Sequence, residues 1–386
     1  MSTVPVGFNG IEVDMLSLGD ADCIVVTQWN NSYPHRVLID GGSGADADVV
    51  IDFLRSRGQT TFWAVLCTHG HNDHARGLIK VVQDKSFTFT NGWMHDIRKH
   101  ISADALRRAS AASDGVNEVV ENARELASAF ASRGIVPREP LAGCNIAGYP
   151  FMHVLGPSVP YYKNVLEEFT KVDVPIPLTS PFASLLGARH ALGGPSSPWA
   201  TLASIPTPPS AISSLIPQSP RSSLADLFAG VLENSSVKDA PITQPFNKTS
   251  VILGVNYTGH RFLFTGDTGA DSLDLVPSDW KGLKWMQVPH HGSDGNLSQK
   301  NIERFCPEFA YISARGDSSH PSRAIVNGLI KVGTQVFSTH SLNPGHLWFW
   351  MDSVPYRGDY GPAEVLKASG GMKSVDWGSL LAATGR

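Results

Sequence analysis

The stretch VLCTHGHNDHARGL, residues 65–78, places four potential metal ligands within six positions: His69, His71, Asp73 and His74. They follow residues 61–68 (TFWAVLCT), a nearly unbroken apolar run that is typical of a strand buried on both faces. Residues 75–83 (ARGLIKVVQ) have helical spacing. The stretch therefore predicts a strand, a ligand-bearing turn and a helix that begins at or just after His74.

The spacing of the four residues indicates two ligand sets. His69 and His71 alternate on an extended segment, so both rings can point to one side, and Gly70 between them leaves that side open. Asp73 and His74 come one turn later, where the strand becomes a helix. Imidazole and carboxylate ligands together suit zinc, manganese or iron. A pair of such ions would need a carboxylate that bridges them.

Asp267 is the candidate bridge, because it ends the predicted strand RFLFTGD (261–267) at a Gly-Asp-Thr-Gly turn. The stretch VPHHGSDG (288–295) supplies a further histidine at another strand end, His290 or His291. Adjacent residues on a strand point to opposite faces, so we expect only one of the two to coordinate a metal.

The pattern around these motifs predicts an α/β fold. Strands are expected at 11–18, 23–29, 35–40, 61–68, 149–157, 250–257, 261–267, 283–292, 309–314, 334–340 and 346–351, and helices at 45–58, 75–83, 115–134, 297–305 and 322–333. Strands and helices occur in both halves of the chain, with the histidines and carboxylates at strand ends. We therefore expect an αββα sandwich of two mixed β-sheets with outer helices and a site on one edge.

Composition bounds the remaining organisation. We interpret residues 1–386 as a single domain with a large insertion at about 85–245, which includes a Pro/Ser-rich loop or lid at 186–224. The net charge of −4 gives no general attraction to nucleic acid, so a polyanion would be held by a local patch or by metal. Four scattered cysteines, no signal-peptide pattern and no membrane-spanning apolar run predict a cytoplasmic protein without a membrane partner. The oligomeric state is left open.

Several other reactive residues are given a structural interpretation. Cys67 lies in the buried strand and is expected to pack rather than react. The isolated histidines are interpreted as surface or packed core residues: His95, His100, His153, His190, His260 and His340.

The HxHxDH stretch after an apolar strand resembles the metallo-β-lactamase-fold hydrolases. Further stretches are similar to one branch, the hydrolase domain of the ComEC-type DNA-uptake proteins and their free-standing relatives: VDMLSLGDADCIVV (13–26), VLIDGG (37–42), SVILGVNYTGHRFLFTGD (250–267), VPHHGSDGN (288–296) and SSHPS (318–322). The resemblance covers roughly residues 8–84 and 245–350.

This resemblance implies a centre of two divalent ions, Zn²⁺ in preference to Mn²⁺. One ion would be bound by His69 and His71, and the other by Asp73 and His74, with Asp267 between them. The second ion would also take a histidine of the pair, His291 in preference to His290.

The resemblance also implies residues that support the centre. Asp40 would orient a ligand histidine, and His320 would contact a substrate phosphate or donate a proton to the leaving group. Many members of the superfamily have another histidine where this chain has Asn247 or Ser250, which leaves the first ion one ligand short. Where the branch commonly reads GQGD, this chain reads Gly-Asp-Ala-Asp: the aspartate Asp22 is kept, and Ala21 stands in place of the second glycine.

The implied reaction is hydrolysis by a metal-activated water, with Asp73 also accepting a hydrogen bond from that water. We expect a phosphodiester substrate, a nucleic acid or nucleotide, whose phosphate nearby basic residues could neutralise: Lys248, Arg261, Arg315 and Arg323. One alternative is a hydrolase of a lactone, thioester, β-lactam or phosphorylcholine ester, because the same centre serves all of these bonds. A second alternative is a non-catalytic member that binds metal or a partner.

Overall fold

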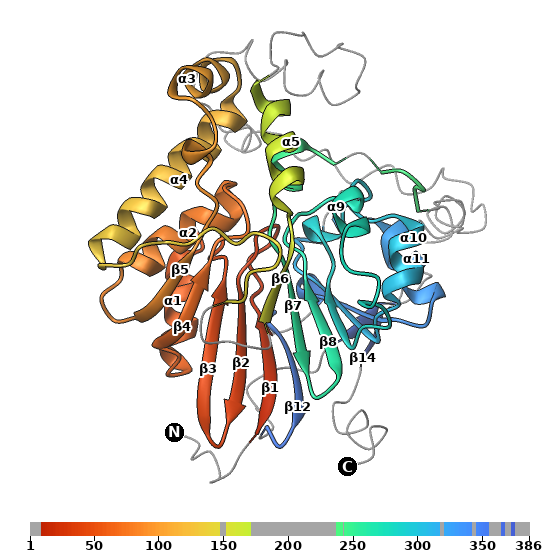
Figure 1. The fold of residues 1–386 in the computed structure, drawn as a ribbon. Coiled ribbons are helices and arrows are strands. Elements are labelled where there is room, and N and C mark those ends of the chain that lie inside the picture. The colour runs from red at the N-terminus through yellow and green to blue at the C-terminus, as the bar shows by residue number, and fades with distance from the viewer. Residues whose placement is uncertain are drawn as a thin grey trace, which may run out of the picture.

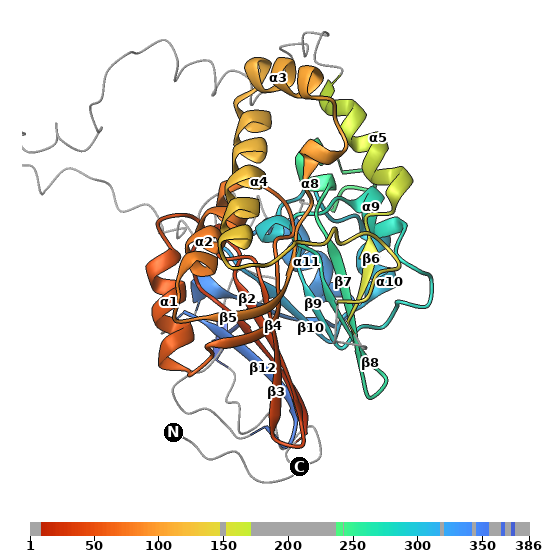
Figure 2. The same ribbon diagram turned by 60° about the vertical axis from the view of Figure 1, so that its left-hand side comes forward.

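Two mixed β-sheets pack face to face, and helices cover both outer faces (Figures 1 and 2). The computed structural model describes residues 9–146, 152–170, 237–241, 243–316, 320–341, 345–354, 364–366 and 372–374. The predicted αββα sandwich is therefore confirmed. The predicted loop at 186–224, which includes His190, lies outside the described residues.

The first sheet has the strand order β12-β1-β2-β3-β4-β5. Its strands are β1 (Gly10–Met15), β2 (Ile24–Asn30), β3 (Tyr33–Ile39), β4 (Thr61–Leu66), β5 (Thr88–Trp93) and β12 (Leu347–Asp352). Strands β1 to β3 run antiparallel, whereas β3, β4 and β5 run parallel and are joined by helices. Strand β12 comes from the far end of the described chain and pairs antiparallel with β1, so the first sheet needs residues from both halves.

The second sheet has the order β14-β13-β11-β10-β9-β8-β7-β6. Its strands are β6 (Met152–Gly156), β7 (Ile252–Tyr257), β8 (His260–Phe264), β9 (Trp285–Gln287), β10 (Phe309–Ile312), β11 (Gln335–Ser338), β13 (Glu364–Leu366) and β14 (Met372–Ser374). Strands β8 to β11 are parallel, so their carboxyl ends meet at one edge of the sheet.

Helices form the outer layers and a group above the strand ends. The first sheet is covered by α1 (Ala47–Ser56), α2 (Asn72–Gln83) and α4 (Asp114–Ser132), and the second by α9 (Ala270–Asp274), α10 (Gln299–Phe305) and α11 (Arg323–Lys331). The other helical segments are η1 (Ile97–Lys99), α3 (Ala103–Ala112), α5 (Val159–Thr170), α8 (Pro245–Lys248), η3 (His290–Gly292) and η4 (Thr339–Ser341). Helices α3 and α5 rise beyond the upper end of the sandwich (Figure 1).

Part of the predicted insertion at 85–245 contributes to the two sheets. Strand β5 pairs with β4, and β6 pairs with β7, so both lie on sheet edges next to strands of the motif-bearing regions. That this interval is an insertion remains a prediction. Among the described residues, no helix is both long and apolar enough to cross a membrane.

Three apolar layers hold the sandwich together. The layer between the sheets contains fully buried side chains from both, among them Val13, Leu66, Phe264 and Tyr311. Two further layers lie between each sheet and its helices. Complete burial of one such side chain stabilises the fold by about 1.5–3 kcal/mol. The many buried side chains of these layers therefore hold in place the strand ends that carry the polar motifs.

Two glycines let α2 lie directly against the loop after β3. A Cβ atom on Gly77 would lie 1.9 Å from the carbonyl oxygen of Gly41, and one on Gly41 would lie 2.3 Å from the backbone nitrogen of Leu78. The Gly41 N–H donates to the carbonyl of His74 across this contact (3.0 Å). The close approach brings Asp40, at the end of β3, beside His74.

Candidate metal centre

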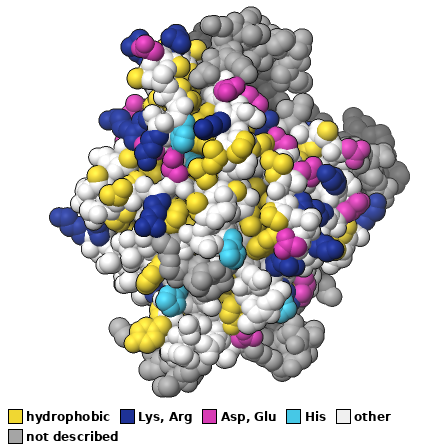
Figure 3. All heavy atoms as spheres, in the orientation of Figure 1, with side chains coloured by type: hydrophobic (Ala, Val, Ile, Leu, Met, Phe, Trp, Pro, Cys, Tyr) yellow, Lys and Arg dark blue, Asp and Glu magenta, His cyan; other side chains and the backbone are white. Residues whose placement is uncertain are grey.

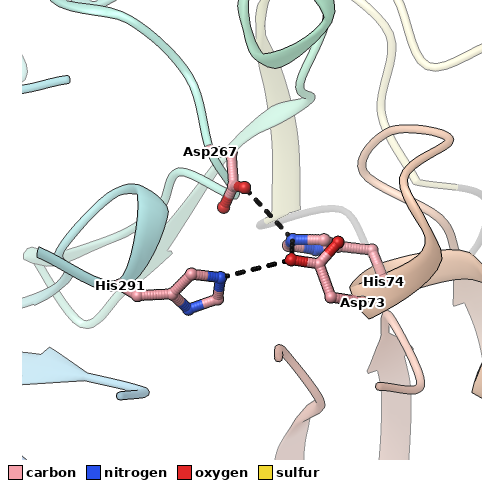
Figure 4. A group of neighbouring side chains, drawn as sticks. All are labelled: Asp73, His74, Asp267 and His291. Carbon is pink, nitrogen blue, oxygen red and sulfur yellow. Dashed lines mark ion pairs between the residues drawn. The ribbon is translucent and has the colours of Figure 1, made fainter. Parts of the chain in front are cut away.

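The predicted ligands meet where β4, β8 and β9 end. The segment after β4 supplies His69 and His71 and leads into α2, which carries Asp73 and His74. Asp267 follows β8, and His291 lies in η3 after β9. Figure 4 shows Asp73 and His74 on one side, and Asp267 and His291 on the other, with their polar atoms pointing toward one another.

Asp73, His74, Asp267 and His291 form a compact set that we call the Asp73 group. His74 Nε2 lies 3.3 Å from Asp267 Oδ2 and 3.9 Å from Asp73 Oδ2, and His291 Nε2 lies 3.5 Å from Asp73 Oδ2. Ligand atoms about 2.1 Å from one tetrahedral ion are about 3.4 Å apart, so these separations fit a shared cation.

His69, His71 and Asp267 form a second set, the His69 group. His69 Nε2 lies 3.1 Å from His71 Nδ1 and 3.7 Å from Asp267 Oδ2. The Asp267 carboxylate thus belongs to both groups. Two imidazoles and one carboxylate are a donor set that zinc uses in sites that keep a position open for water or substrate.

Unpartnered atoms point to cations at these positions. Among the described residues, His74 Nε2, His291 Nε2 and both carboxylate oxygens of Asp267 are buried and accept or donate no hydrogen bond. Buried polar atoms are normally satisfied, because leaving one unpaired costs about 1–3 kcal/mol. The residues present therefore fit divalent metal ions, whose identity the geometry leaves open.

The hydrogen bonds of two histidines aim the other ring nitrogen at the Asp73 group. His74 Nδ1 lies 2.8 Å from Asp40 Oδ2, and His291 Nδ1 lies 2.9 Å from the carbonyl oxygen of Ser313. A carbonyl or carboxylate oxygen only accepts, so Nδ1 carries the proton in both rings and Nε2 keeps its lone pair for a metal. Asp40 is itself fixed by the N–H (2.7 Å) and hydroxyl (2.6 Å) of Thr68.

Electrostatics within the cluster set the charges in the absence of a cation. Burial opposes charge on His74, but the carboxylates of Asp267 and Asp73 raise its pKa well above the usual value. Burial opposes charge on His291 too, but the nearby carboxylates of Asp73 and Asp267 raise its pKa to about 9. Burial and the charge of His74 lower the pKa of His69 well below its usual value. Protons on His74 and His291 therefore balance the carboxylates until a cation replaces them.

His290 and His291 do not follow the strand geometry expected from the sequence. Both have left-handed backbones, with φ of 49° and 54°, in a short helical turn. Both rings therefore lie on the side of the carboxylates, and His290 Nε2 is 3.9 Å from Asp267 Oδ2. His290 Nδ1 contacts Asn296 Oδ1 (2.9 Å) and Asn247 Nδ2 (3.3 Å), so Asn247 lies beside the paired histidines.

His320 lies at the rim of the cluster. Its ring centroid is 5.6 Å from that of His290 and 5.9 Å from that of His291, and its Nδ1 is 3.8 Å from Asp20 Oδ1. The backbone of Arg315 donates to the same Asp20 carboxylate (2.9 Å), and the Arg315 side chain is exposed. His320 is thus close enough to face a substrate bound at the cluster.

The other basic residues named from the sequence have different surroundings. Arg261 packs over Trp280 and lies 3.6 Å from Asp279. Lys248 lies 3.5 Å from Asp271, and Arg323 is exposed at the start of α11. Within the part of the chain that the structure describes, none of these three side chains contacts a member of the two ligand groups.

A third set, Asp22, Asp40 and His74, has hydrogen-bond partners in place of an open position. The Asp22 carboxylate accepts from Gln287 Nε2 (2.7 Å) and from the Ser313 hydroxyl, and burial raises its pKa. Sequence reasoning missed Gln287 and Ser313 because they lie far along the chain from Asp22 and belong to no motif. The one signal was Asp22 itself, the aspartate kept from the GQGD pattern.

The residues given a structural interpretation lie outside both groups. The Cys67 thiol donates to the carbonyl of His69, and burial raises its pKa well above the usual value, which disfavours a thiolate. His100 contacts Glu139, and His153 contacts Asn145. His260 is exposed in the β7–β8 hairpin, His340 contacts the Ser338 hydroxyl, and the ring of His95 stacks on Tyr162.

Comparison with known proteins adds a family match. The family model described as "Metallo-beta-lactamase superfamily" matches residues 23–138, which contain the HxHxDH stretch. Similar solved structures include the metallo-beta-lactamase fold protein YhfI from Bacillus subtilis (9% identity, 89% of this chain and 100% of that chain, TM-score 0.42). Another is a diphosphatase from the PhnP family, with 11% identity, 86% of each chain covered and a TM-score of 0.34. A third is a putative metallo-beta-lactamase from Thermotoga maritima, with 18% identity, 34% of this chain and 54% of that chain covered, and a TM-score of 0.22. No curated protein matches.

The family match and the two ligand groups both indicate a protein that binds metal. A His/Asp cluster at the joined edges of two mixed sheets supports a metal-dependent hydrolase. The metallo-beta-lactamase superfamily model thus matches residues 23–138, and the two mixed sheets with their outer helices are consistent with the metallo-β-lactamase fold.

Proposed function

We propose that the protein is a phosphodiesterase that acts on a nucleic acid or a nucleotide through a metal-activated water. The observation that carries the proposal is the Asp267 carboxylate, which belongs to both the Asp73 group and the His69 group. A carboxylate shared in this way suits a pair of ions that act on one substrate.

Divalent ions bound there would lower the pKa of a coordinated water to about 7 and so supply hydroxide at neutral pH. The protein's own part is to hold and orient that water and the substrate. The Asp73 side chain is 34% exposed, whereas that of Asp267 is 1% exposed. Asp73 is therefore the carboxylate that a water can reach and to which it can donate a hydrogen bond.

Two observations favour a phosphate ester over other substrates. His320 lies beside the cluster and offers a donor for phosphate oxygens or a proton for the leaving group. The stretches VPHHGSDGN and SSHPS, which carry the paired histidines and His320, resemble the ComEC-type branch. On the face drawn in Figure 3, basic and acidic side chains are intermixed, which favours a nucleotide or short strand over long duplex DNA.

The test combines metal analysis with a substrate panel. Purified protein with Zn²⁺ or Mn²⁺ is assayed on bis-p-nitrophenyl phosphate, oligonucleotides, lactones, a thioester, phosphorylcholine esters and nitrocefin. The His69→Ala, Asp73→Ala double variant disrupts both ligand groups, and we expect it to lose phosphodiesterase activity by on the order of 10³-fold. His260→Ala, in the exposed β7–β8 hairpin, is the matched histidine control and should keep full activity.

The panel also separates the competing functions. Activity on a lactone, thioester, phosphorylcholine ester or nitrocefin alone would replace the phosphodiesterase proposal with another hydrolase. Phosphodiesterase activity that survives the double variant would show that the reaction occurs elsewhere. Bound metal without hydrolysis of any substrate would favour a non-catalytic member.

A further inference from the structure

Asp22 lies in the loop between β1 and β2 and is buried, with 1% of its surface exposed. Its backbone already contacts the ligand-bearing segments of the first sheet. The Asp22 N–H donates to the carbonyl of Asp73 (3.2 Å), and the Gly42 N–H donates to the carbonyl of Asp22 (2.8 Å). The Asp22 backbone is therefore fixed to the loop that begins the Asp73 group.

The Asp22 side chain reaches across to the second sheet through two hydrogen bonds. One carboxylate oxygen accepts from Gln287 Nε2 (2.7 Å), at the end of β9. The other accepts from the hydroxyl of Ser313, which follows β10. Both donors are buried, so each bond is made away from water and has an unpaired polar group as its alternative.

One of these two arms leads to the turn before Asp267, and the other leads to the ring of His291. Gln287 Oε1 accepts from the N–H groups of Thr265 (3.0 Å) and Gly266 (3.2 Å), the two residues before Asp267. The carbonyl of Ser313 accepts from His291 Nδ1, which leaves His291 Nε2 for the Asp73 group. One carboxylate is thus linked to the backbone of Asp73, to the turn that carries Asp267 and to the ring of His291.

We propose that Asp22 is a positioning residue that fixes the ligands of the Asp73 group, which come from two sheets, relative to one another. The inference rests on the proposed metal centre but not on the identity of the substrate. The His69 group shares only Asp267 with this network and has its own histidines on the segment after β4. Loss of Asp22 should therefore weaken one metal-binding event and largely spare the other.

The experiment is a Co²⁺ titration of metal-free protein, followed by visible absorption, with a competing chelator to resolve two affinities. The event that His291→Ala weakens most is assigned to the Asp73 group. Residues that orient metal ligands typically change metal affinity by about 10–100-fold, and we expect Asp22→Ala to weaken this event by that factor. Asp22→Asn should weaken it less, because the amide oxygen still accepts from Gln287.

A matched control separates positioning from general stability. Asp14 on β1 is also a fully buried aspartate that accepts from a glutamine, Gln59 Nε2 (3.1 Å), but it belongs to neither ligand group. Asp14→Ala and Asp22→Ala should both lower the melting temperature of the metal-free protein, and only Asp22→Ala should change the Co²⁺ affinity of the Asp73 group.

Ser313→Ala tests the arm to His291. It keeps the backbone carbonyl that accepts from His291 but removes the link to Asp22. It should weaken the same event by itself and add less in the Asp22→Ala background than in wild type.

The inference is overturned if Asp22→Ala leaves both affinities unchanged, or if both fall together by the amount seen for Asp14→Ala. A wild-type protein that binds no metal would overturn it together with the proposed function. A wild-type protein that binds two ions but hydrolyses no phosphodiester would refute the proposed function alone, since the affinities still decide the role of Asp22.

Discussion

Metal binding at the Asp73 group should release protons, because two of its histidines have raised pKa values in the metal-free protein. The perturbation is addition of Zn²⁺ to metal-free protein at pH 7. His291 has a pKa raised to about 9, so it is about 99% protonated at that pH. His74, whose pKa is also raised well above its usual value, is protonated as well. Coordination through Nε2 needs neutral rings, so each ion bound to this group displaces about two protons.

The same values set the pH dependence of the affinity. A proton on His291 competes with the metal below pH 9, so affinity rises with pH and levels off above that value. From pH 7 to pH 9 this residue alone raises the affinity about 50-fold, or by about 2.3 kcal/mol, because half of the His291 rings still carry the proton at pH 9.

Isothermal titration calorimetry is carried out in several buffers that differ in ionisation enthalpy. The slope of the observed binding enthalpy against the buffer ionisation enthalpy gives the number of protons released. We expect a slope near two for the ion of the Asp73 group, and a slope lower by about one in His291→Ala. Zero protons released at pH 7, or an unchanged slope in His291→Ala, would refute the charge assignment of this cluster.

Three further predictions concern single residues. Asp40→Asn places an amide N–H against His74 Nδ1, which favours the wrong tautomer, so Co²⁺ titration should show about 10–100-fold weaker binding at the Asp73 group. Gly77→Ala would force a methyl group into the Gly41 carbonyl and should cost about 3 kcal/mol in urea unfolding, while Gly44→Ala, whose Cβ meets only Arg76 Cβ at 3.6 Å, should cost far less. Burial lowers the pKa of His95 to about 3, so below pH 6.5 the unfolded chain binds the extra proton and stability falls as pH falls. Between pH 8 and pH 5 wild type should lose about 2 kcal/mol more than His95→Phe, and equal losses would contradict this.

The fold could be predicted because its signals are local. The apolar run at 61–68 and the helical spacing after His74 each specify one element, and the same holds for the strands that end in the Gly-Asp turn and the paired histidines. Parallel strands place their carboxyl ends at one edge, so residues at those ends were expected to meet. The convergence of His69, His71, Asp73, His74 and Asp267 follows from this topology.

The details of the centre depend on contacts that have no local signal. The sequence suggested that one of two adjacent histidines would turn away, but the left-handed backbone of His290 and His291 brings both rings to the carboxylates. Gln287 and Ser313 contact Asp22 across 265 and 291 positions of chain, and only the packing of the two sheets makes them neighbours. The spacing of residues along the sequence does not reveal such long-range hydrogen-bonded pairs.

The Asp73 group draws its ligands from positions about 190 residues apart, with Asp73 and His74 on one sheet and Asp267 and His291 on the other. During synthesis, the first pair leaves the ribosome long before the second exists, so the emerging chain cannot form this group until residue 291 is out. Because the two pairs belong to different sheets, the group is complete only when both sheets have packed together. A newly made molecule would therefore acquire its ions at the end of folding, when the completed sandwich offers all four side chains at once.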